Sequence, residues 1–173
     1  NTGLTFTAGT GSDTLSYSAD SATQSITLNS VSSGTASGTV SNGGTDSFTG
    51  LEAIVGGSGT ADSITSTSAG EALIITGANS GTIDGFAFSG VESVDLGVGN
   101  DTATVQTAGS LSGSLSLGGW NDTLSYAGYD SPVNATLSRE NTLSITAITG
   151  GVIGVESLTL SSNNDTLTVG SSG

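Results

Sequence analysis

Short stretches in which apolar and hydroxyl-bearing residues alternate recur along the whole chain. After each of five aspartates an apolar residue stands between two Ser or Thr residues, as Leu15 stands between Thr14 and Ser16. The equivalent apolar residues are Ile64, Ala103, Leu124 and Leu167. An alternation with a period of two predicts a half-buried β-strand at each place, with the apolar side chain facing inward and the hydroxyls outward.

These strands belong to a repeated motif with two parts. The first part is an aspartate followed by the strand, at Asp13, Asp62, Asp101, Asp122 and Asp165. The second part is a glycine followed two residues later by a glutamate, in the pairs Gly50 and Glu52, Gly90 and Glu92, and Gly154 and Glu156. We expect the glycines to form corners at positive φ. The glutamates share strand parity with Ile54, Val94 and Leu158, which predicts that they turn inward as acceptors at a corner.

The spacing of the motifs indicates a coil. Successive motif aspartates are 49, 39, 21 and 43 residues apart, which fits turns of about twenty residues. If residue 173 were followed by a new residue 1, the next spacing would again be 21, and the joined segment would match the segment 101–126 at 11 of 26 positions. We therefore predict that residues 1–173 form a single all-β module without significant helix. The expected fold is a β-solenoid, a right-handed parallel β-helix of about eight turns, and one period of a longer array.

The composition agrees with a folded chain and excludes several partners. Hydrophobic residues make up 34% of the chain and charged residues 9%, whereas disorder usually combines low hydrophobicity with dense charge. Fifteen acidic residues face a single base, Arg139, and the net charge of -14 excludes a nucleic-acid partner. No apolar run approaches the length of a transmembrane segment. The acidic residues either attract hard cations such as calcium or keep a strand-rich protein soluble.

The sequences around the motif aspartates resemble the glycine- and aspartate-rich nonapeptides of RTX-type, or hemolysin-type, calcium-binding β-rolls. Asp13 and Asp101 fit best, whereas Trp120 stands where the nonapeptide before Asp122 has glycine. The resemblance implies calcium between successive turns, with all five motif aspartates as ligands. The alternative is that these carboxylates accept hydrogen bonds from turn amides, as in Asx-turns.

Nearly the full length of the chain also resembles extracellular β-strand-repeat proteins, in which the aspartate and glutamate parts follow one another. This family includes adhesins, surface-layer proteins and fibre modules. The resemblance implies an extracellular or cell-surface location and a repetitive β architecture.

Two further sets of residues are candidates for function. Four asparagines, Asn100, Asn121, Asn134 and Asn164, lie in N-x-T sequons and are candidate glycosylation sites. The hydroxyl pairs beside the inward residues, such as Thr102 and Thr104, would form an ice-binding ladder if they lay on one flat face. The alternative is ordinary outward-facing threonine, which strands favour.

The sequence favours a structural function. A β-helix lyase needs a basic residue as catalytic base, and only Arg139 is available, while isolated aspartates in repeated turns do not single out an acid–base pair. We predict a non-enzymatic building block of an extracellular fibre or surface layer that stacks end to end through its terminal turns. The alternatives are an adhesin that binds glycans through inserted loops, such as residues 29–46, and an ice-binding protein.

Overall fold

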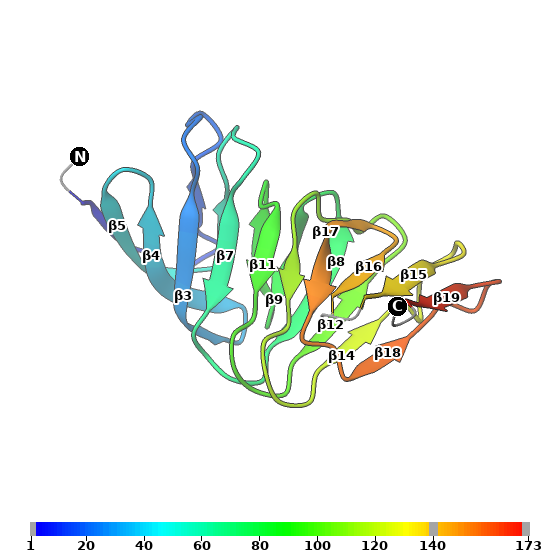
Figure 1. Cartoon of the computed structure of the whole chain (residues 1–173). Coiled ribbons are helices and arrows are strands. Elements are labelled where there is room, and N and C mark those ends of the chain that lie inside the picture. The colour runs from blue at the N-terminus through cyan, green and yellow to red at the C-terminus, as the bar shows by residue number, and fades with distance from the viewer. Residues whose placement is uncertain (1–2, 139–141, 171–173) are drawn as a thin grey trace.

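The computed structural model describes residues 3–138 and 142–170 and contains two mixed β-sheets, with no helix among those residues (Figure 1). The prediction of an all-β chain is confirmed. In this part of the chain there is also no helix of the length and apolarity needed to cross a membrane. Arg139 lies outside the described residues.

The larger sheet, called the long sheet, has eleven strands within residues 3–138 and 142–170. In spatial order they are β1 (Thr5–Thr7), β5 (Thr45–Leu51), β4 (Thr35–Ser41), β3 (Ser25–Ser32), β7 (Ser63–Ser66), β11 (Ser93–Asp95), β13 (Leu115–Ser116), β17 (Ile148–Ile153), β16 (Leu143–Ile145), β15 (Asn134–Leu137) and β19 (Thr166–Val169).

The smaller sheet, called the short sheet, has eight strands in the same described part of the chain. In spatial order they are β18 (Ser157–Thr159), β14 (Thr123–Ser125), β12 (Thr102–Val105), β8 (Ala72–Gly77), β9 (Ser80–Ile83), β10 (Phe86–Ser89), β6 (Ala53–Val55) and β2 (Thr14–Ser16). The strands predicted after the five motif aspartates are all present, as β2, β7, β12, β14 and β19.

The chain passes back and forth between the two sheets, so that strands from separate parts of the sequence lie side by side and parallel. In the short sheet β12 pairs with β14, with Thr102 opposite Thr123 and Ala103 opposite Leu124. Corners join the strands, and the corner glycines Gly50, Gly90 and Gly154 have φ angles of 75°, 65° and 72°. These left-handed angles are the ones that the sequence predicts for them.

Three antiparallel meanders interrupt the parallel pairing, and the sequence analysis did not predict them. They are β3–β4–β5, β8–β9–β10 and β15–β16–β17. The expectation of an inserted loop over residues 29–46 is wrong, because most of this stretch forms strands of the first meander. The tight turns Ser33–Gly34 and Asp84–Gly85 have positive φ at both residues, as two-residue hairpins require.

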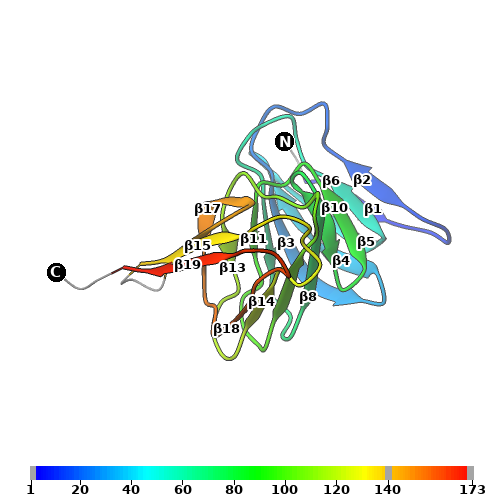
Figure 2. The same cartoon turned by 90° about the vertical axis from the view of Figure 1, so that its right-hand side faces the viewer.

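One hydrophobic core fills the space between the sheets, which face each other in Figure 2. The inward residues of three motif strands, Ile64, Ala103 and Leu124, are fully buried in it. Burying an aliphatic side chain of the size of Ile or Leu contributes about 1.5–3 kcal/mol. Because the core residues come from many strands, neighbouring strands stabilise one another.

Backbone segments approach closely at one corner of the stack. A Cβ atom on Gly118, whose φ is 93°, would overlap the carbonyl oxygen of Gly97, and one on Gly154 would overlap the backbone of Gly118. Only glycine fits this column, because both the φ angle and the space exclude a side chain.

Candidate functional site

The acidic residues of the two motif parts occupy the same structural position, directly before a strand. Asp122 precedes β14 and Glu156 precedes β18, and these two strands are paired. The backbone N–H of Asp122 donates to Oε2 of Glu156 at 2.8 Å. Contacts of the same kind and length join Asp62 to Glu92 and Asp13 to Glu52. The aspartate and glutamate parts are therefore equivalent places in neighbouring strands, which the sequence analysis did not recognise.

The longest run of such contacts, here called the carboxylate ladder, consists of Glu71, Asp101, Asp122 and Glu156. The N–H of Glu71 donates to Asp101 at 2.7 Å, and that of Asp101 donates to Asp122 at 2.8 Å. Each donor belongs to the earlier strand and each carboxylate to the later one, so the ladder has a direction. A hydrogen bond to a charged group typically contributes about 1.5–3 kcal/mol.

The interior of the ladder concentrates negative charge away from water. Glu71, Asp101 and Asp122 are buried, and the second carboxylate oxygen of each has no hydrogen-bond partner among the described residues. Burial raises the pKa of Glu71, and its interaction with Asp101 raises it further, although the Ser66 hydroxyl donates to Glu71 at 2.7 Å and opposes this. Burial also raises the pKa of Asp122. Folding therefore favours the protonated form of these two carboxyl groups.

The motif aspartates outside the ladder also accept hydrogen bonds from backbone amides. Asp62 accepts the Gln24 N–H at 2.7 Å through Oδ1 and the Gly57 N–H at 2.6 Å through Oδ2. Asp13 accepts the Gly9 N–H at 3.1 Å. Asp165 accepts the Val133 N–H at 2.8 Å. These are the contacts of turn-stabilising aspartates.

Among the described residues, the motif aspartates are not gathered into one acidic cluster. Calcium takes about six to eight oxygen ligands, and each motif aspartate already uses at least one oxygen for a backbone amide. Within residues 3–138 and 142–170 no group of three or more acidic side chains is arranged to hold a metal ion. Calcium binding by Asp13, Asp62, Asp101, Asp122 and Asp165 stays a prediction, with a test given below.

The hydroxyl pairs do not form a single ladder. Thr102 lies opposite Thr123, and Thr104 lies opposite Ser125, in the short sheet. The pair on β2 lies at the other edge of that sheet, and the pairs on β7 and β19 lie in the long sheet. One flat array of all five pairs, on which the ice-binding alternative depends, is therefore not assembled.

All four sequon asparagines are exposed, at Asn100, Asn121, Asn134 and Asn164. The side-chain oxygen of Asn100 accepts the N–H of Asn121 at 3.2 Å, so these two residues stack at adjacent corners. Their exposure is compatible with glycosylation, which stays a prediction.

The core is uncovered at the end of the molecule formed by β18 and β19. Leu167 on β19 lies opposite Ala135 of β15 and shares its core-facing side. Ala135 is buried, but Leu167 is 53% exposed, because β19 is the edge strand of the long sheet as far as the described residues show. A cavity of about 400 Å³ opens here between Leu137, Leu143, Val155, Glu156, Leu158 and Leu167. Figure 2 shows β15 and β19 extending beyond the rest of the sheets.

The opposite end of the molecule, formed by β1 and β2, is also uncovered. Phe6 lies opposite Phe48, and Leu15 lies opposite Ile54. Phe48 and Ile54 are fully buried, whereas Phe6 and Leu15 are only half-buried. Both ends of the stack therefore expose a cross-section of the core, bordered by edge strands.

Comparisons with protein-family models, with curated proteins and with solved structures find no match for this chain.

Proposed function

We propose that the chain is a β-solenoid that builds an extracellular fibre or surface layer by stacking end to end, in a structural rather than a catalytic role. The observation that carries the proposal is that core-facing side chains are uncovered at both ends. Leu167 and Val169 are exposed at one end, and Phe6 and Leu15 are half-buried at the other. Uncovered apolar area favours association by about 25 cal/mol per Å² that it removes from water.

The edge strands favour a partner that is itself a strand. β1 and β19 are the edges of the long sheet, and β2 and β18 are the edges of the short sheet. An edge strand presents unpaired N–H and C=O groups, and proteins usually block such edges with charges, proline or bulges. β19 reads Thr-Leu-Thr-Val and β1 reads Thr-Phe-Thr, with neither charge nor proline.

The partner that fits is a second copy, because the contact follows a pattern inside the chain. Asp165 and Asp13 lie directly before the edge strands β19 and β2, as Asp101 and Asp122 lie directly before the paired strands β12 and β14. By that equivalence β2 of the next copy pairs with β19, and Leu167 lies opposite Leu15 as Ala103 lies opposite Leu124. The N–H of Asp165 donates to the Asn163 carbonyl at 3.0 Å in the single chain, and in the stack it would donate to Asp13 instead, as the N–H of Asp101 donates to Asp122.

The negative charge complements this arrangement. A net charge of -14 keeps the sides of neighbouring stacks apart, while the apolar ends still attract one another. The extracellular location rests on the resemblance to β-strand-repeat proteins.

Electron microscopy and sedimentation velocity over a range of protein concentrations test the proposal. We expect filaments one molecule wide that grow with concentration. The axial rise per copy should lie between about 38 and 53 Å, which are the lengths of eight and eleven strand spacings. A second protein contains two copies joined from residue 173 to residue 1. The proposal is refuted if both proteins stay monomeric at every concentration and the two joined copies melt independently of each other.

A further inference from the structure

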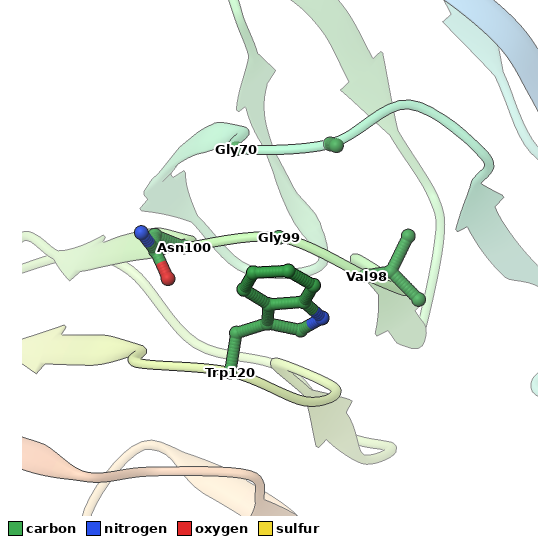
Figure 3. A pocket seen from close by; sticks show the side chains of 6 residues that line it. Gly70, Val98, Gly99, Asn100 and Trp120 are labelled. Carbon is green, nitrogen blue, oxygen red and sulfur yellow. The ribbon is translucent and has the colours of Figure 1, made fainter.

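Three successive corner loops form a pocket on the side of the stack, away from both ends. The pocket has a volume of about 510 Å³ and is lined by Ala69, Gly70, Val98, Gly99, Asn100 and Trp120. The loops lie directly before Glu71, Asp101 and Asp122, so the hydrogen bonds of the carboxylate ladder hold them in register. In Figure 3 the indole ring of Trp120 lies between Asn100 and Val98, with Gly70 on the neighbouring loop.

Trp120 occupies a backbone position that two other aspartate motifs, those of Asp13 and Asp101, fill with glycine. It lies two residues before a motif aspartate and has a φ of 104°, while Gly11 and Gly99, at the same place in their motifs, have φ angles of 131° and 129°. A side chain in a sparsely populated region costs about 1–3 kcal/mol, and such residues cluster at functional sites. Trp120 is 74% exposed, so burial of the ring does not offset this cost.

The surroundings of the ring define the chemistry of a ligand. Beside the flat indole lies Val98, which is 58% exposed and extends the apolar surface. Asn100 uses its side-chain oxygen to accept the Asn121 N–H, and its NH₂ group, which has no partner among residues 3–138 and 142–170, can donate to a ligand. An apolar platform with one or two polar groups at its edge is typical of a ligand site.

We propose that this pocket binds a neutral carbohydrate, with the C–H face of a sugar ring on Trp120 and its hydroxyls at Asn100. A sugar ring combines the apolar face and the hydroxyl rim that this site complements. The net charge of -14 repels acidic polysaccharides, and it also opposes a second copy of the chain as the occupant. The site lies on the side of the stack, so this inference does not depend on end-to-end assembly.

The test uses the fluorescence of Trp120, which is the only tryptophan of the chain. The purified protein is titrated with cellohexaose, maltohexaose and chitohexaose, and with oligogalacturonate as an acidic control. We expect at least one neutral sugar to shift the emission to the blue with micromolar to millimolar affinity, and the acidic sugar to have no effect. No shift with any of the neutral sugars overturns the proposal. A shift that depends on protein concentration alone also overturns it, because it identifies a second copy as the occupant.

Variants separate binding from folding, with calorimetry replacing fluorescence where the tryptophan is lost. Trp120→Gly should weaken binding about tenfold or more, and Trp120→Phe should retain most of it. Trp120→Gly should also raise the melting temperature, since it removes the strain, so its loss of binding would not reflect unfolding. Ile153→Ala, at an exposed apolar residue on β17, should leave binding unchanged. Equal sugar binding by the wild type and Trp120→Gly overturns the proposal. Filament formation by Trp120→Gly is a separate measurement, which tests end-to-end assembly and not sugar binding.

Discussion

The backbone N–H of Asp101 donates to the Oδ1 of Asp122 in the neighbouring strand at 2.8 Å, and both residues are buried. Asp122→Asn keeps the accepting oxygen and removes a buried charge, so we expect it to raise stability at neutral pH. Asp122→Ala leaves the buried N–H of Asp101 without a partner and should lower the free energy of unfolding by about 1–3 kcal/mol. Urea denaturation of the two variants measures the difference. Equal losses in both would mean that the charge itself is required.

Stability should decrease as the pH rises from acid to neutral. The raised pKa values of Glu71 and Asp122, caused first by burial, mean that the folded chain holds these protons more tightly than the unfolded chain. Their contribution is fully present below the ordinary values of about 4.3 for Glu and 3.9 for Asp, and is lost as the pH passes through the raised values. Thermal melts from acid to neutral pH should show a falling melting temperature.

Glu71→Gln provides the matched test of this pH dependence. It removes the titrating group, so the melting temperature should change less with pH than in the wild type. Asp130→Asn removes the same charge from an exposed position and serves as the control. A melting temperature that rises with pH through this window, or the same slope in both variants, would contradict the assignment to the ladder.

Gly118 and Gly119 are adjacent in sequence but should respond differently to substitution. A Cβ on Gly118 meets the backbone of Gly97 at a φ of 93°, whereas a Cβ on Gly119 meets nothing within 4 Å. We expect Gly118→Ala to lower the free energy of unfolding by about 2–4 kcal/mol and Gly119→Ala to change it little. Chemical denaturation measures both. Similar effects of the two variants would mean that the corner is not packed as described.

The open end at β19 predicts a variant that blocks assembly without unfolding the chain. Leu167→Asp places a charge on the uncovered core cross-section, so it should abolish filaments and leave the melting temperature nearly unchanged. Ile153→Asp makes the same change at an outward residue of similar exposure, 49% against 53%, and should leave filaments intact. Sedimentation velocity and electron microscopy report the result. Filaments in both variants, or in neither, would remove β19 from the contact.

Calcium dependence separates the two interpretations of the motif aspartates. If they act only as acceptors of backbone amides they need no metal, and the melting temperature should be the same in calcium and in chelator. A bound ion would raise it, because a ligand that binds only the folded state stabilises that state according to its concentration. A calcium-dependent rise that is lost in Asp62→Asn would favour the metal interpretation.

Period-two alternation predicted the strands at 14–16, 63–66, 102–105, 123–125 and 166–169, because each has an apolar residue between two hydroxyl-bearing ones. The meanders were not predicted because they lie between the aspartate motifs on which the prediction of strands rested. Their signal was present in Asp84–Gly85, a dipeptide typical of two-residue hairpins. The sequence pattern did not predict which motif residues are exposed at the ends of the stack. Leu124 and Leu167 occupy the same motif position, but Leu124 is buried and Leu167 is exposed because different strands surround them.

The site was only partly readable in the sequence for a similar reason. Glu71 belongs to no motif and was missed, although it lies 30 residues before Asp101, as Asp62 lies 30 residues before Glu92. An aspartate and a glutamate are equivalent here because the strands that follow them pair with each other. The amino-acid sequence alone does not show which strands pair. The sequence shows Trp120 as a departure from glycine, but its strained φ angle is a property of the folded chain.

The unequal strand counts of the two sheets have a consequence for a fibre. With eleven strands along one side and eight along the other, counted over the described residues, the molecule is a wedge. Its first and last strands, β1 and β19, both belong to the side with the surplus. The chain alternates between the long and the short sheet. In a stack that keeps this alternation, the long sheet of one copy is continued by the short sheet of the next, so each copy is turned over relative to the one before. The bends of two successive copies therefore cancel. Such a fibre runs straight and presents Trp120 to its two flanks in turn.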